Sequence, residues 1–167
     1  KNPKKKSIQR LFHPRLKIQP GSLLAIAIKQ KEILGGPLEI STGDMWGLLT
    51  PQNRSQLITC AKADKSFYSL YGYDIQFVVR IDLLGNKEIG EIYFHLVPKN
   101  NRLLIGSFVV IKKTHSEKTY INWYNDAVEL YHKGNKLMSF LKMDIARKML
   151  GVGSKVFAYN DLKKVTE

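Results

Sequence analysis

The sequence predicts an α+β domain in which N-terminal helices pack on a curved antiparallel sheet (a meander), followed by a C-terminal helical hairpin. Three observations lead to this prediction. Segments with helix-capping signals come first, three strand-like segments separated by tight turns come next, and two segments with helical spacing come last. Helices and strands grouped in this way, instead of alternating, are typical of the α+β class.

The composition is that of one globular domain. The chain has 167 residues, of which 44% are hydrophobic and 25% charged, and these values exclude the disordered and fibrous classes. Its single cysteine, Cys60, excludes an internal disulfide. No apolar run approaches the ~20 residues that cross a bilayer, so we expect the chain as given to be soluble.

Residues 1–20 predict a basic flexible arm. They contain three prolines, lack sustained periodicity and precede the first acidic residue, Glu32. The formal net charge of the whole chain is +13, and the arm contributes strongly to it. Such an arm is suited to nucleic acid, an anionic membrane surface or an acidic protein. Its candidate binding residues are Lys4, Lys5, Lys6, Arg10, Arg15 and Lys17.

The first elements are predicted to be helices. Residues 21–34 have Ser22 as a candidate N-cap and end at Gly35. Residues 43–63 predict two short helices, the first capped by Asp44 and the second by Thr50 with Pro51 at its first position. Residues 64–73 then form an aromatic, irregular linker to the sheet.

Three strands are predicted at residues 74–84, 88–97 and 102–113, joined by tight turns into an antiparallel meander. Apolar residues alternate with polar ones in the first strand, so one face is expected to be buried and the other largely wet. The expected buried set is Ile75, Phe77, Val79, Ile81 and Leu83, and the expected wet set is Asp74, Gln76, Arg80 and Asp82.

Residues 121–167 predict a helical hairpin and tail packed on the same domain as residues 21–120. The first helix has an apolar stripe, the break falls at Gly134, and the second helix has its own stripe. The first stripe is Trp123, Ala127, Leu130 and Tyr131, and the second is Leu137, Leu141 and Ile145. In the tail, the residues expected to dock are Val156, Phe157 and Leu162.

The hairpin resembles a single tetratricopeptide unit. The residues that carry the resemblance are Trp123, Ala127, Tyr131, Gly134, Ser139 and Ala146. Repeat arrays need about three units to bury a continuous core, and the sequence contains no second copy. We therefore expect the hairpin to pack on its own domain or on a partner. The predicted interaction surface is Trp123, Tyr131, Phe140 and Arg147.

Residues 22–113 resemble the cystatin-like superfamily of the nuclear transport factor type. The resemblance rests on the order of the predicted segments, which is a helix, a short helix, the segment WGLLTPQNRSQLI, an aromatic linker and a three-stranded meander. The resemblance implies helices packed across a curved sheet to form a cone. Its members include ligand-binding domains, isomerases, hydratases and non-catalytic assembly or envelope proteins. This chain closes with a hairpin instead of further strands, so we expect a shallow or covered cone.

A cone that acts on a small molecule needs an acid or base together with a hydrogen-bond donor. The residues available for a ligand pocket are Tyr68, Tyr71, Tyr73, Asp74 and His95. Tyrosines at a sheet edge and a solvated strand histidine are the alternative interpretation. The four histidines lack metal-ligand spacing, and no nucleophile elbow or phosphate loop is present. No catalytic residue, cofactor or metal is therefore predicted.

We expect a non-catalytic protein-interaction or scaffold domain with a protein partner or self-association, belonging to a membrane-associated or bacterial envelope assembly. Two alternatives stay open at this point. One is a small-molecule-binding or isomerase-like cone. The other is a nucleic-acid-binding protein that uses its basic surface.

Overall fold

The computed structural model describes residues 8–36, 38–50, 55–60, 65–151 and 156–160. A helix, α2 (Pro20–Leu34), precedes a four-stranded antiparallel sheet with the order β1-β4-β5-β6. Its strands are β1 (Glu39–Leu49), β4 (Ile75–Leu84), β5 (Ile89–Lys99) and β6 (Arg102–Lys112). The predicted α+β class and the meander of the last three strands are confirmed.

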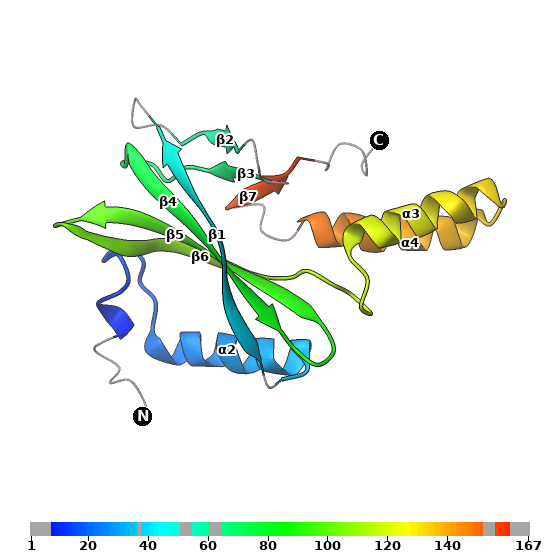
Figure 1. Ribbon diagram of the computed structural model, residues 1–167, viewed down its shortest axis with the longest axis horizontal. Helices are drawn as coiled ribbons and strands as arrows, with labels where there is room; N and C mark the ends of the chain where they lie inside the picture. The colour runs from blue at the N-terminus through cyan, green and yellow to red at the C-terminus, as the bar shows by residue number, and fades with distance from the viewer. Residues whose placement is uncertain (1–7, 37, 51–54, 61–64, 152–155, 161–167) are drawn as a thin grey trace.

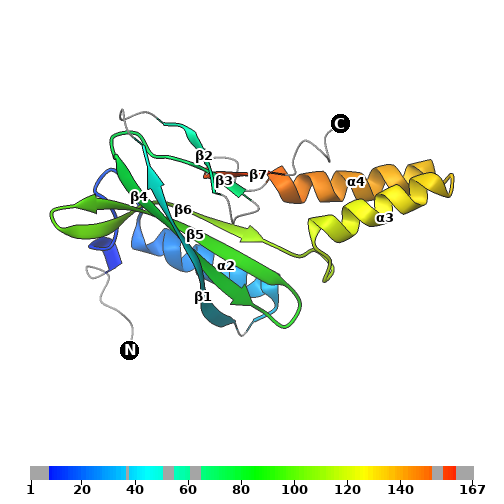
Figure 2. The same cartoon turned by 45° about the horizontal axis from the view of Figure 1, so that its top comes forward.

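A second sheet has three short strands in the order β2-β3-β7, all antiparallel. They are β2 (Leu57–Thr59), β3 (Lys65–Tyr68) and β7 (Phe157–Tyr159). The chain between β6 and β7 forms two helices, α3 (Tyr120–His132) and α4 (Lys136–Gly151), as predicted. Figure 1 shows α2 below the large sheet and the small sheet above it, while Figure 2 shows the α3–α4 hairpin projecting away from both sheets.

The helix α2 ends where the sequence predicts and begins earlier than expected. Gly35 has a left-handed φ of 74°, and the backbone N–H of Gly36 donates to the carbonyl of Lys31 at 2.7 Å, so the C-terminus is closed as in a Schellman motif. The prediction that Ser22 is the N-cap is wrong. Pro20 begins the helix because its fixed φ suits the first turn, and Gln19 is the N-cap.

The C-terminus of α2 is anchored by Leu34, which is fully buried at the β4–β5 turn. The N–H groups of Lys87 and Glu88 donate to the Leu34 carbonyl at 3.1 and 3.2 Å. A Cβ added to Gly85 would collide with that same carbonyl. This close approach explains why glycine occupies the turn.

We expect Gly85→Ala to lower the free energy of unfolding by about 1–3 kcal/mol, because the backbone of Leu34 must move to admit the methyl group. Urea denaturation at pH 7 measures the change. Gly21→Ala is the matched control, since an added Cβ there meets nothing. Equal stabilities of Gly85→Ala and Gly21→Ala would contradict this account of the turn.

The two short helices predicted for residues 43–63 are wrong. Residues 39–49 form β1, which pairs with β4 from Glu39↔Leu84 to Leu49↔Ile75, and residues 57–59 form β2. Thr50 does not cap a helix, because its hydroxyl donates to the carbonyl of Tyr73 at 2.6 Å. Pairing with a distant strand outweighs these local capping signals, as is common for strands. Residues 65–68 of the predicted linker also form a strand, β3.

The wet face predicted for the first strand of the meander is also wrong. Gln76 and Val78 are fully buried, whereas Ile75 is half exposed. The amide of Gln76 accepts from the N–H of Leu70 at 2.7 Å and donates to the carbonyl of Tyr73 at 2.8 Å. This face of the sheet is buried because the small sheet and the start of the hairpin cover it. The shared core consists of Leu48, Phe67, Val78, Tyr93, Ile111, Ala146, Leu150, Val156, Phe157 and Tyr159.

The tail docks through two of the three residues named from the sequence. Val156 and Phe157 are buried, and Leu162 lies outside the described residues. At the other end of the chain, residues 11–13 run beside β6. His13 N–H donates to the Ile105 carbonyl at 2.9 Å, and Ile105 N–H donates to the Leu11 carbonyl at 2.8 Å. Residues 11–13 of the basic arm therefore form a single parallel bridge with β6, between Phe12 and Ile105.

Candidate functional site

The helical hairpin is built from local signals. Thr119 and Asn122 form a capping box that begins α3. Gly134, with φ of 80°, turns the chain after α3, and the side-chain carbonyl of Asn135 accepts from the N–H of Met138 at 3.3 Å to begin α4. Each of these residues occupies a helix end, so the hairpin geometry follows from its own sequence.

The two helices approach each other over small residues. Ala127, Ser139 and Ala146 are buried between them. The Ser139 hydroxyl donates to the Ala127 carbonyl at 2.8 Å, which satisfies the one polar side chain of this set. Small side chains permit the close contact, and they leave little room for larger residues on the same side of α4.

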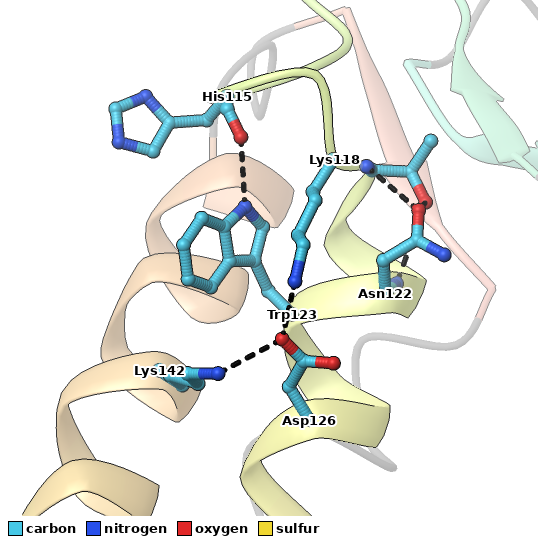
Figure 3. Close-up of polar contacts among 7 residues, drawn as sticks. His115, Lys118, Asn122, Trp123, Asp126 and Lys142 are labelled. Atoms are coloured by element: carbon cyan, nitrogen blue, oxygen red, sulfur yellow. Dashed lines mark hydrogen bonds and ion pairs between the residues drawn. The ribbon is translucent and has the colours of Figure 1, made fainter.

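The root of the hairpin is fixed by Trp123 and Asp126 (Figure 3). The indole N–H of Trp123 donates to the His115 carbonyl at 3.0 Å. Asp126 accepts from Lys118 at 2.7 Å and from Lys142 at 2.9 Å, and these hydrogen bonds lower the pKa of its carboxyl. Both ammonium groups also lie within 6 Å of the indole ring centre, at 5.4 and 5.8 Å. Trp123, predicted for the interaction surface, is therefore half-buried and joins the two helices to the sheet.

The far end of the hairpin exposes a group of large apolar side chains that we call the tip patch. Leu137 is 71% exposed, Phe140 68% and Tyr131 60%. Met138 and Leu141 complete the tip patch. Leu137, Phe140 and Leu141 are at i, i+3 and i+4, so they share one side of α4. The predicted inward stripe of Leu137 and Leu141 is therefore wrong, because Ser139 and Ala146 take the side that faces α3.

The charged residues around the tip patch are mostly basic. The sequence has no acidic residue between Glu129 and Asp144, whereas Lys133, Lys136 and Lys142 lie in that interval. Lys133 pairs with Glu129 and Lys142 with Asp126. Lys136 is exposed and has no ion pair with any described residue. Arg147, also predicted for this surface, is exposed and pairs with Asp144 at 3.0 Å.

The residues proposed for a ligand pocket have different surroundings. Tyr68 is half-buried at the end of β3, and Tyr71 is mostly exposed. The Tyr73 hydroxyl lies 2.8 Å from Nε2 of His13, and the carbonyl of Asp74 accepts from the N–H of Thr50 at 2.8 Å. Within the described part of the chain, no hydrogen bond or ring contact joins these residues to His95. A shared pocket stays a prediction.

His95 is fully buried at an irregularity in the β5–β6 pairing. Neither ring nitrogen has a hydrogen-bond partner among the described residues, and the same holds for the hydroxyl of Ser107, its cross-strand neighbour. Burial lowers the pKa of His95 to about 4. The imidazole is therefore neutral near pH 7, and the interpretation of His95 as a solvated strand histidine is wrong.

Sequence reasoning missed a buried ionic cluster around Glu91, which lies on the same face of β5 as His95. Glu91 is fully buried, with Lys113 at 2.8 Å, Lys65 at 3.9 Å and the donating hydroxyl of Tyr93 at 2.7 Å. Burial alone would raise the pKa of Glu91, but these partners outweigh it and the pKa lies below its ordinary value. The signal was the alternation in β5, which places Glu91, Tyr93 and His95 on one face of the strand.

The basic arm is only partly described. Lys4, Lys5 and Lys6 lie outside the described residues, so nucleic-acid binding through them stays a prediction. Among the residues that the structure does describe, no group of three or more His, Cys, Asp or Glu side chains is placed to hold a metal ion. In the same residues, no helix has the length and apolar character needed to cross a membrane.

Comparison with known proteins adds no relative: no protein-family model, curated protein or solved structure matches this chain.

Proposed function

We propose that this chain is a non-catalytic protein-interaction or scaffold domain whose hairpin binds an acidic, amphipathic helix of a partner protein. The observation that carries the proposal is the tip patch. The hairpin is closed by Ala127, Ser139 and Ala146 and fixed at its root by Trp123, so its large apolar residues at the tip are not needed for its own packing. Exposed apolar groups of this kind mark interaction sites.

The charge around the tip patch supports an acidic partner. A helix with apolar residues at i, i+3 and i+4 and acidic residues beside them would complement both the tip patch and Lys136. A second copy of this chain is disfavoured, because it would bring the same basic residues, within a chain of net charge +13, against one another.

The proposal is tested with a fluorescent peptide of leucine and glutamate at helical spacing, titrated by fluorescence anisotropy. We expect Phe140→Ala to weaken binding by at least about tenfold, the effect of losing one apolar anchor. Ile121→Ala is the matched control, since Ile121 is exposed on α3 outside the tip patch. A peptide with lysine in place of glutamate should bind far more weakly.

Three outcomes would contradict the proposal. One is no binding of the acidic peptide. Another is equal loss of affinity in Phe140→Ala and Ile121→Ala. The third is a wild-type dimer, seen by light scattering, that becomes monomeric in Phe140→Ala, which would assign the tip patch to a second copy.

We also propose that the partner belongs to a membrane-associated or envelope assembly, as the resemblance to cystatin-like proteins suggests. That resemblance is supported by α2 and by the antiparallel meander, whereas the short helix expected around Trp46 is a strand, β1. The resemblance of the hairpin to a tetratricopeptide unit is supported by Ala127, Ser139 and Ala146 at the close contact of α3 and α4.

A further inference from the structure

A cavity of about 320 Å³ lies between α2 and the large sheet, on the opposite face from His95. This volume is at the lower end of the range of about 300–1,000 Å³ for ligand sites. Of the described residues that line it, Gln30 alone has a polar side chain. The walls come from α2, the segment before it and the sheet, and include Leu23, Ile26, Leu11, Phe94 and Phe108.

The inner and outer sides of α2 have different surroundings. Leu34 is buried at the C-terminal end, whereas Leu24 and Ile28, on the outer side of α2, are more than half exposed. Figure 1 shows α2 running along the sheet below the strands. An apolar space lined by α2, by the segment before it and by the sheet is suited to an alkyl chain.

A second, basic cavity adjoins the first. It has a volume of about 590 Å³, and Phe12 lines both. Its charged lining residues are Arg10, Lys99 and Arg102, none of which forms an ion pair with a described residue. None of the described residues that line it is acidic.

The positive potential at this place also acts on His13. The pKa of His13 lies below its ordinary value because the side chain is buried and because Lys99 and Arg15 are positively charged. An anion in the adjoining cavity would offset that potential.

We propose that the two cavities together bind one molecule of a single-chain fatty acid. The alkyl chain occupies the apolar cavity below α2, and the carboxylate pairs with Arg10, Lys99 and Arg102 beyond Phe12. One chain fits the smaller cavity, and a carboxylate matches guanidinium groups in both geometry and charge. This site is independent of the tip patch, since the hairpin contributes no residue to it.

The test is isothermal titration calorimetry of sodium dodecanoate below its micelle concentration. We expect saturable binding of one molecule, and binding at least about tenfold weaker for dodecan-1-ol, which lacks the carboxylate. Ile26→Trp fills the apolar cavity and should abolish binding. Leu24→Trp, the same change on the outer side of α2, should leave it intact. Arg102→Glu, at an exposed position that leaves the core untouched, should weaken binding of dodecanoate at least about tenfold.

Absence of dodecanoate binding to the wild-type protein would overturn the proposal, as would equal affinities of Arg102→Glu and wild type. An equal loss of dodecanoate affinity in Ile26→Trp and Leu24→Trp would also overturn it. A parallel titration with phosphatidylglycerol vesicles distinguishes a lipid surface from a free fatty acid. If the wild-type protein binds these vesicles but not dodecanoate, and Leu24→Trp no longer binds the vesicles, then α2 binds a membrane surface. That outcome would overturn the fatty-acid site.

Discussion

Replacing Glu91 with glutamine is expected to lower the free energy of unfolding by about 3–5 kcal/mol. Glu91 is the fully buried carboxylate between Lys65 and Lys113. Lys65 is itself buried, with its ammonium 4.6 Å from the ring centre of Tyr159 and 5.5 Å from that of Tyr93. Glutamine removes the negative charge that faces this buried ammonium at 3.9 Å, and removing one charge of a buried ion pair is strongly destabilising.

Urea denaturation at pH 7 measures the effect. Asp144→Asn is the control, because Asp144 pairs with Arg147 and Lys148 at the surface and should change stability by at most about 1 kcal/mol. The double variant Lys65→Met/Glu91→Leu should be more stable than Glu91→Gln, since apolar replacement of a buried pair costs less than removing one of its two charges. A loss below about 1 kcal/mol in Glu91→Gln would show that the cluster does not stabilise the core.

The second large effect is a pH dependence that arises from His95. In the folded chain its pKa is lowered to about 4 by burial, against an ordinary value of 6.5. The unfolded chain therefore binds a proton first as the pH falls, and stability that is complete above pH 6.5 is lost progressively down to pH 4. The loss amounts to about 3 kcal/mol, at about 1.4 kcal/mol for each pH unit.

His95→Leu should remove this loss, so that the difference in stability between variant and wild type grows as the pH falls from 6.5 to 4. Leucine also removes the two buried ring nitrogens of His95 that have no hydrogen-bond partner among the described residues. We therefore expect His95→Leu to be at least as stable as the wild type at pH 7. Urea denaturation at pH 7, 6, 5 and 4 gives the curves, with His132→Gln, at an exposed position of α3, as the control. Parallel curves for His95→Leu and wild type would refute the assignment.

The sequence predicted the elements whose signals are local. The meander follows from alternation and from tight turns, and the Asn100–Asn101 turn has the positive φ angles, 49° and 58°, that such hairpins require. The hairpin was predicted from the break at Gly134 and from the apolar spacing of α3. In each case, residues near one another in the chain determine the structure.

The rest depended on contacts between distant segments. The strand β1 pairs with β4 across residues 50–74, and β7 completes a sheet with β3 from the other end of the chain. Because that small sheet covers the large one, Gln76 is buried on a face that was expected to be wet, and Glu91 and His95 are buried on the same side of the sheet. At the hairpin, the larger leucines were assigned to the interior, whereas the structure places Ser139 and Ala146 there.

The central claim is that the tip patch binds an acidic helix. The most direct test is the set of amide chemical-shift changes in ¹⁵N-labelled protein on titration with the leucine–glutamate peptide. We predict changes concentrated in the last turn of α3 and the first two turns of α4, around Tyr131, Leu137 and Phe140, and little change in the sheets. Changes that fall mainly on α2 or the sheets, or no changes at all, would contradict the claim.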